Sequence, residues 1–172
     1  MKQMKPQNYI FNSIYSDGYK TITFISPEHL KIHQGKMFNI FGNISLNNDQ
    51  TKILSAYTND VEVHFSFFLH CTDDFTIGFF EGGEITEGNI IQPINNNRIL
   101  NSPSNLIIFE DPTVISIGDK LFEVSLYGSQ SINPSTTRYN EFVLKPFTTY
   151  IFIITAGSNG TKIFYKLDWY EN

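Results

Sequence analysis

The chain has 172 residues, about one domain's worth, and can bury a core without disulfide bonds. Hydrophobic residues make up 41% of it and aromatic residues 15%, which excludes a disordered segment and a coiled coil. The net charge is -5 and no basic cluster is present, so we expect no nucleic-acid partner. No run of 18 apolar residues occurs either, so we expect no membrane-spanning segment.

The residue types favour β-structure. Ile, Val, Thr, Phe, Tyr and Trp together account for 68 residues, whereas alanine occurs only at Ala56 and Ala156. The six abundant types suit a pleated, half-buried surface, and alanine is the best helix former. The composition therefore predicts an all-β protein before any motif is considered.

In chain order, residues 1–19 predict an irregular arm and residues 20–172 a single domain. The arm carries Tyr9, Phe11 and Tyr15 among polar residues. Aromatic side chains on a free tail are costly in water, so we expect the arm to dock on this domain or on a neighbour. The N-terminus has no apolar core typical of a signal peptide, so classical export is not expected.

Short strands are predicted along the rest of the chain. The clearest lies in Val61–His70, where every second residue is apolar and Phe68 alone breaks the polar face, as a subunit contact could. The glycine-containing segment 156–160 predicts a hairpin connection between the last two strands. The expected strands are Lys20–Ile25, Lys36–Ile44, Val61–His70, Phe75–Glu81, Leu106–Glu110, Lys120–Gly128, Glu141–Lys145, Thr149–Thr155 and Thr161–Tyr170. This spacing predicts a single-domain β-sandwich, jelly-roll-like in type.

Histidines and acidic residues are the candidate metal ligands of this sequence. His29 and His33 share a face only if residues 28–34 form a helical turn, and a zinc site would then need a carboxylate as well. Glu81, Glu84 and Glu87 in a glycine-rich stretch could hold calcium, but a solvated hairpin tip explains them equally well. We therefore predict no metal and no cofactor.

The sequence carries no recognisable catalytic motif, such as a nucleophile elbow or a P-loop. Cys71 fits a small buried apolar residue better than a nucleophile. Paired carboxylates of a glycoside hydrolase stay open as a third hypothesis, because one sequence cannot show two acids facing each other. We expect a protein that is not an enzyme.

Four pieces, in order, resemble a family of tailed-bacteriophage virion proteins that decorate and stabilise the capsid. They are His29–Phe38, Pro93–Arg98, Arg138–Tyr150 and Leu167–Glu171. The resemblance covers about residues 20–171. It implies a β-rich homo-oligomer, a trimer by preference, which is made in the host cytoplasm and binds the major capsid protein on the outside of the head.

Aromatic and arginine side chains outside the core are the expected interface groups. A carbohydrate- or receptor-binding sandwich, on a phage fibre or secreted, is the alternative function, because exposed aromatic rings can stack on sugars. The interface candidates are Tyr9, Phe11, Tyr15, His29, His33, Phe68, Arg98, Arg138, Phe164 and Tyr170. Phe68, Phe164 and Tyr170 could equally be buried within the sandwich.

Overall fold

The computed structural model describes residues 12–16, 19–23, 26–86, 88–100, 102–132 and 141–172. One short helix, α1 (Pro27–His33), precedes the main strands. The main strands are β3 (Met37–Leu46), β4 (Thr51–Tyr57), β5 (Val63–Cys71), β6 (Phe75–Glu81), β10 (Ile107–Glu110), β12 (Asp119–Leu126), β15 (Thr149–Ala156) and β16 (Thr161–Glu171). The shorter strands are β1 (Asn12–Ser16), β2 (Tyr19–Thr23), β7 (Glu84–Ile85), β8 (Asn89–Ile91), β9 (Ile94–Asn95), β11 (Val114–Ser116), β13 (Gln130–Ile132) and β14 (Phe142–Leu144).

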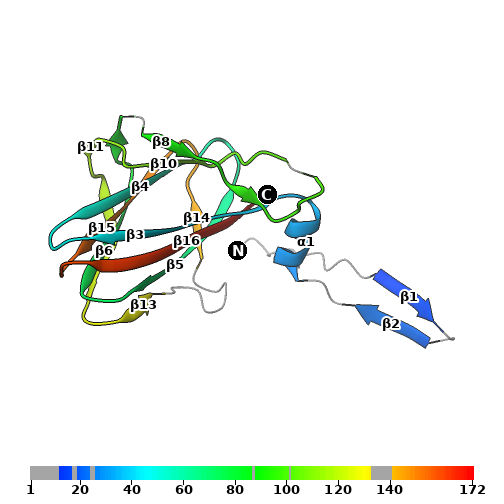
Figure 1. Ribbon diagram of the computed structural model, residues 1–172. Helices are drawn as coiled ribbons and strands as arrows, with labels where there is room; N and C mark the ends of the chain where they lie inside the picture. The colour runs from blue at the N-terminus through cyan, green and yellow to red at the C-terminus, as the bar shows by residue number, and fades with distance from the viewer. Residues whose placement is uncertain (1–11, 17–18, 24–25, 87, 101, 133–140) are drawn as a thin grey trace, which may run out of the picture.

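Two antiparallel sheets form the body of the protein (Figure 1). Sheet I has the order β12-β6-β15-β4-β10-β8, and sheet II has the order β13-β5-β16-β3-β9, with β14 also paired to β5. The connections β3–β4, β4–β5, β5–β6 and β15–β16 each cross from one sheet to the other. This is the strand order of a jelly roll, in which two Greek keys form a two-sheet sandwich. The predicted all-β, jelly-roll-like sandwich is confirmed.

The alternation predicted for Val61–His70 is confirmed in β5, and β16 shows the same pattern. Val63, Phe65, Phe67 and Leu69 are each at most 1% exposed, and the residues between them lie on the outer face of sheet II. In β16, the residues Ile163, Tyr165, Leu167 and Trp169 pack into the same core. A period of two places one face of each strand against the opposite sheet, and burial of these apolar side chains stabilises the sandwich.

Two local predictions are wrong. Residues 12–16, expected to be irregular, form β1 and pair with β2 from Asn12 opposite Thr23 to Ser16 opposite Tyr19. Segment 156–160 was expected to join a hairpin, but β15 and β16 belong to different sheets. The glycine signal for a turn was correct, since Gly160 has φ +73. After this turn the chain crosses from sheet I to sheet II instead of pairing β16 with β15. The composition of a turn does not specify which strand pairs with which.

Cys71 lies at the end of β5, fully buried. Burial raises the pKa of its thiol to about 12. The nucleophilic thiolate is therefore almost absent near neutral pH, as expected for a small apolar core residue.

We expect Cys71 to resist thiol reagents in the folded protein. At pH 8 a disulfide reagent such as DTNB should leave native protein unlabelled over the time in which the guanidinium-unfolded chain reacts completely. Absorbance at 412 nm gives both rates. Rapid labelling of the native protein would contradict the burial of this side chain.

Candidate functional site

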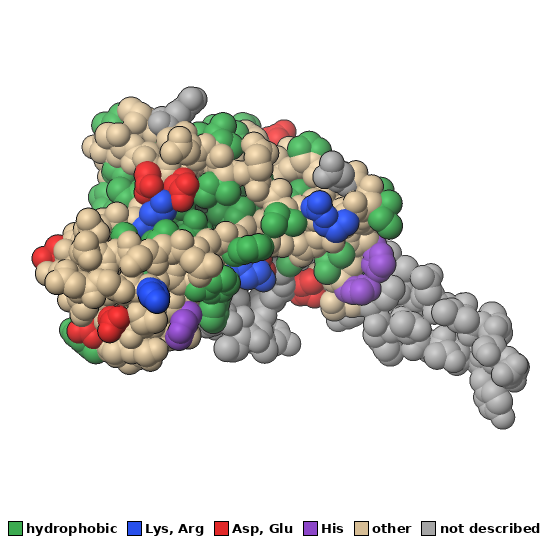
Figure 2. Space-filling view, in the orientation of Figure 1, with side chains coloured by type: hydrophobic (Ala, Val, Ile, Leu, Met, Phe, Trp, Pro, Cys, Tyr) green, Lys and Arg blue, Asp and Glu red, His purple; other side chains and the backbone are tan. Residues whose placement is uncertain are grey.

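Helix α1 brings His29 and His33 to one face. Ser26 caps the helix by accepting a hydrogen bond from the His29 backbone N–H at 3.2 Å, and the chain leaves the helix through Gly35, whose φ is +70. The two imidazole Nε2 atoms lie 2.9 Å apart, and the rings meet at 73°. Both side chains are exposed, and Figure 2 shows histidine gathered at the surface. The helical turn considered from the sequence is thus present.

The run of asparagines Asn95, Asn96 and Asn97 is fixed by its own side chains. Asn95 is buried and donates from Nδ2 to the carbonyl oxygens of Gly35 at 2.8 Å and Ser102 at 2.9 Å. Its Oδ1 accepts from the Asn97 backbone N–H at 2.8 Å, and the Asn96 amide accepts from the Asn39 amide. These bonds join the loop to the segment after α1 and to β3.

Asn97 continues the arrangement toward the loop tip. Its Oδ1 accepts the backbone N–H groups of Ile99 at 3.0 Å and Leu100 at 3.1 Å, while its Nδ2 donates to the His33 carbonyl at 3.0 Å. The loop thereby presents Arg98, Ile99 and Leu100 to solvent, with Ile99 92% and Leu100 54% exposed. We call residues 95–100 the asparagine loop. It holds an exposed apolar pair in a fixed position beside a cation.

Aromatic side chains also gather on the outer face of sheet II. Phe68 and Phe164 contact each other with ring centroids 5.9 Å apart, and both are half-buried. Phe41 is 59% exposed, and the register places Lys166 opposite both Phe41 and Phe68. We call Phe41, Phe68, Phe164 and Lys166 the outer aromatic face; Figure 2 shows hydrophobic side chains in this region.

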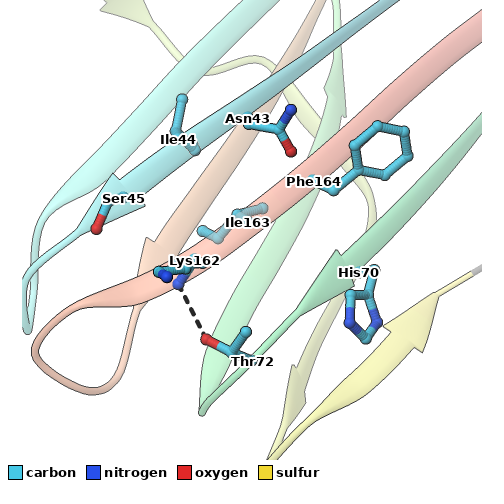
Figure 3. A pocket seen from close by; sticks show the side chains of 8 residues that line it. All are labelled: Asn43, Ile44, Ser45, His70, Thr72, Lys162, Ile163 and Phe164. Atoms are coloured by element: carbon cyan, nitrogen blue, oxygen red, sulfur yellow. Dashed lines mark hydrogen bonds between the residues drawn. The ribbon is translucent and has the colours of Figure 1, made fainter.

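A depression of about 520 Å³ adjoins the outer aromatic face at Phe164. Its lining combines one aromatic ring with polar groups from three neighbouring strands and the residue after one of them (Figure 3). The residues are Asn43, Ile44, Ser45, His70, Thr72, Lys162, Ile163 and Phe164. A lining with an aromatic ring at one end and several polar groups can take an amphipathic ligand.

Tyr170, an interface candidate, is only 8% exposed. Its ring stacks on His64 with centroids 4.3 Å apart, and its hydroxyl donates to Glu141 at 3.1 Å. The His64 ring nitrogens lie 2.6 Å from a Glu141 oxygen and 2.9 Å from a Glu62 oxygen. Tyr170 thus follows the alternative of burial within the domain, and little of it is accessible to a partner.

Glu81, considered for calcium, is engaged by protein groups instead. Lys145 Nζ donates to one carboxylate oxygen at 2.6 Å and the Tyr150 hydroxyl to the other at 2.9 Å. The hydrogen bond from Lys145 lowers the pKa of Glu81, and burial raises the pKa of Tyr150 to about 12. Glu84 lies exposed in β7, and Glu87 lies outside the described residues. The three acids are not shown to form a calcium site.

The lowered pKa of Glu81 predicts a pH-dependent contribution to stability. Because the folded-state pKa lies below the unfolded value, stabilisation is present above the unfolded pKa of ~4.3 and is lost as pH falls through the folded pKa. We expect Glu81→Gln to lower the free energy of unfolding at pH 7 by about 0.5–1 kcal/mol and by nearly nothing at pH 2.5. Urea unfolding at both pH values measures this. Glu84→Gln serves as the control and should show no such difference.

Acids also converge at Lys52, where the pattern is again an ion pair. Lys52 Nζ lies 2.6 Å from Glu110 and 2.7 Å from Asp111. Burial by itself would lower the pKa of Lys52, but the hydrogen bonds to Asp111 and Glu110 outweigh it and raise the pKa. A single lysine thus pairs with both carboxylates, and the three groups form one ion-pair cluster.

The zinc site and four interface candidates are the remaining sequence predictions. Among the residues that the structure describes, no group of three or more His, Cys, Asp or Glu side chains is placed to hold a metal ion, so the carboxylate needed for a zinc site with His29 and His33 is not found there. Tyr15 lies in β1. Tyr9, Phe11 and Arg138 lie outside the described residues.

Sequence reasoning singled out Arg98 but missed Phe41, Ile99 and Leu100. The available signal was an apolar pair directly after a run of asparagines and an arginine. Asparagine side chains fix turns, so apolar residues beside them tend to be displayed rather than buried. Phe41 gave no such signal, since its outward position follows only from the register of β3.

Comparisons with family models, curated proteins and solved structures found no match to this chain. Within the described part of the chain, no helix is long and apolar enough to cross a membrane.

Proposed function

We propose that this protein is a non-enzymatic structural protein that binds protein neighbours, and that these neighbours are the capsid subunits of a tailed phage. The asparagine loop carries the proposal. Ile99 and Leu100 form an exposed apolar pair, and the side-chain hydrogen bonds of Asn95 and Asn97 hold the loop in the conformation that exposes it. A rigid apolar residue beside an arginine is a typical interface anchor.

A second surface supports assembly of several copies. The outer aromatic face combines Phe41, Phe68 and Phe164 with the aliphatic stem and charge of Lys166. Aromatic rings are enriched in the cores of subunit interfaces. A symmetric trimer would bury this face once in each of its three copies. A protein that binds only the assembled capsid stabilises that state by mass action.

The test is binding to empty capsids of the matching phage, measured by co-sedimentation. We expect Ile99→Asp to weaken binding at least tenfold, because a carboxylate would be desolvated in the contact. Ile115→Asp is the matched control, since Ile115 is an isoleucine 65% exposed on β11. Light scattering should show a trimer of the unmodified chain. A monomer that ignores capsids, or equal losses in both variants, would contradict the proposal.

The depression beside Phe164 favours a second function, binding of a carbohydrate. A pyranose could stack on the Phe164 ring while its hydroxyls meet Asn43, His70 and Lys162. On a glycan array, Phe164→Ala should then abolish binding, and Phe147→Ala, at a ring 67% exposed elsewhere, should preserve it. Absence of any glycan signal from the unmodified protein would remove this candidate.

A further inference from the structure

We propose that His29 and His33 form a two-imidazole site for a divalent transition-metal ion, with Cu²⁺ the favoured ion. The site goes beyond the proposed capsid function and does not depend on it. The ligands lie four residues apart on α1, so one turn of helix brings them together. Imidazole nitrogen is a preferred ligand of copper, nickel and zinc ions.

The distance between the ring nitrogens fits adjacent positions on a square-planar ion. The two Nε2 atoms lie 2.9 Å apart and share a hydrogen bond, whose proton the ion would replace. Two ligands at ~2.0–2.1 Å from a metal and at right angles to each other stand about 2.9 Å apart, whereas tetrahedral ligands at the same bond length stand about 3.3 Å apart. The right-angle geometry is typical of Cu²⁺ and Ni²⁺, and Cu²⁺ binds nitrogen ligands more tightly than Ni²⁺ or Zn²⁺.

The backbone around the pair is already fixed. Ser26 caps the start of α1, and the Asn97 side chain donates to the His33 carbonyl at 3.0 Å near its end. Binding then requires small changes of side-chain angle rather than formation of a helix, which reduces the entropic cost. The side chains are exposed, so the remaining coordination positions of the ion are open to water or to a group from a bound partner.

Other groups near α1 do not compete for the ion. The Lys31 ammonium lies over the Tyr170 ring, 5.9 Å from its centroid, and so points to a different partner from His29 and His33. The His64 ring nitrogens face Glu62 and Glu141. His70 lies on β5, and its Nδ1 atom is 2.8 Å from the Ser131 hydroxyl. Among the described residues, its ring contacts a serine and not a second histidine. His70 is therefore the matched single-histidine control.

Isothermal titration of the full chain, prepared without a polyhistidine tag, with CuCl₂ tests the proposal. We expect one ion per chain, and we expect His29→Ala and His33→Ala each to weaken binding at least about tenfold, because each removes one arm of a chelate. His70→Ala should bind as the unmodified chain does. The electron paramagnetic resonance spectrum of the loaded protein should show coupling to two equivalent nitrogens, and Ni²⁺ and Zn²⁺ should bind more weakly.

Folding is controlled separately. Without metal, the double variant His29→Ala/His33→Ala should match the unmodified chain in circular dichroism and melting temperature, because both side chains are exposed. With metal, only the unmodified chain should melt at a higher temperature. The site is disproved if the folded double variant binds Cu²⁺ as tightly as the unmodified chain, or if His70→Ala weakens binding equally. Neither result bears on capsid binding.

Discussion

Replacing Phe79 with alanine is expected to destabilise the protein by about 4 kcal/mol, among the largest effects of any single core substitution. Phe79 lies on β6, is fully buried and stacks on Phe152 with ring centroids 4.2 Å apart. Further rings surround it at 5.1–6.3 Å, from Phe142, Tyr150, Phe122, Phe65 and Phe67. Truncation leaves a cavity between both sheets that these rigid rings cannot fill.

Thermal unfolding followed by circular dichroism measures this effect. A loss of about 4 kcal/mol should lower Tm by roughly 8–16 °C in a chain of this size. Phe79→Leu keeps most of the volume and should cost about half as much, which gives a readable result even if the alanine variant fails to fold. Phe41→Ala, at a ring 59% exposed, should change the stability by less than about 0.5 kcal/mol. Equal effects at Phe79 and Phe41 would contradict the assigned core.

Most of the long strands could be predicted from the sequence because their signal is local, but β4, whose sequence lacks regular apolar alternation, was missed. In β5 and β16 the burial of alternate residues is written into each segment and needs no knowledge of the partner strand. The two- and three-residue strands β7, β9 and β11 were not predicted, since only their pairing partners define them. β1 was missed for the same reason: its polar residues become strand by pairing with β2.

Burial on the outer faces was also beyond the sequence. Ile151 lies on the outward side of β15 and is nevertheless completely buried. A Cβ at Gly83 would come within 2.5 Å of the Ile151 side chain, which shows that the turn after β6 covers it. This cover depends on how the segments around Gly83 and Ser116 fold over sheet I. The alternation of residues within β15 cannot reveal it.

The surface features divide in the same way. His29 and His33 were recognisable by their spacing, and Arg98 by its place in an asparagine run. The partners that give these residues their geometry lie far away in sequence: Asn97 reaches the His33 carbonyl across 64 residues. A single sequence identifies candidate side chains, whereas their mutual positions require the fold.

Glu171→Ala is expected to destabilise the protein by about 3 kcal/mol, although the residue is the last but one of the chain. Glu171 is 3% exposed and lies at the end of β16. Its carboxylate accepts from the Ser104 hydroxyl at 2.7 Å, from the backbone N–H groups of Asn105 at 2.8 Å and Leu106 at 3.3 Å, and from Trp169 Nε1 at 3.3 Å. These bonds hold segment 104–106 against the end of the sandwich.

Removing the carboxylate takes away several hydrogen bonds to a charged group, each worth at most ~1.5–3 kcal/mol, while the N–H groups of Leu106 and Trp169 keep the Ser104 hydroxyl as an acceptor at 3.0 and 3.1 Å. Glu171→Gln retains one carbonyl oxygen for the Oε1 contacts and should lose only about 1–2 kcal/mol, so the two variants separate loss of acceptors from loss of charge. Glu28→Ala, at a half-buried position on α1, is the control. In urea unfolding, the loss in free energy of unfolding should be largest for Glu171→Ala, smaller for Glu171→Gln and smallest for Glu28→Ala. Hydrogen exchange of the Asn105 and Leu106 backbone amides should be faster in the Glu171 variants. An alanine variant as stable as the parent would mean that segment 104–106 is held by other contacts, and that the terminal Trp-Tyr-Glu sequence does not fasten the last strand.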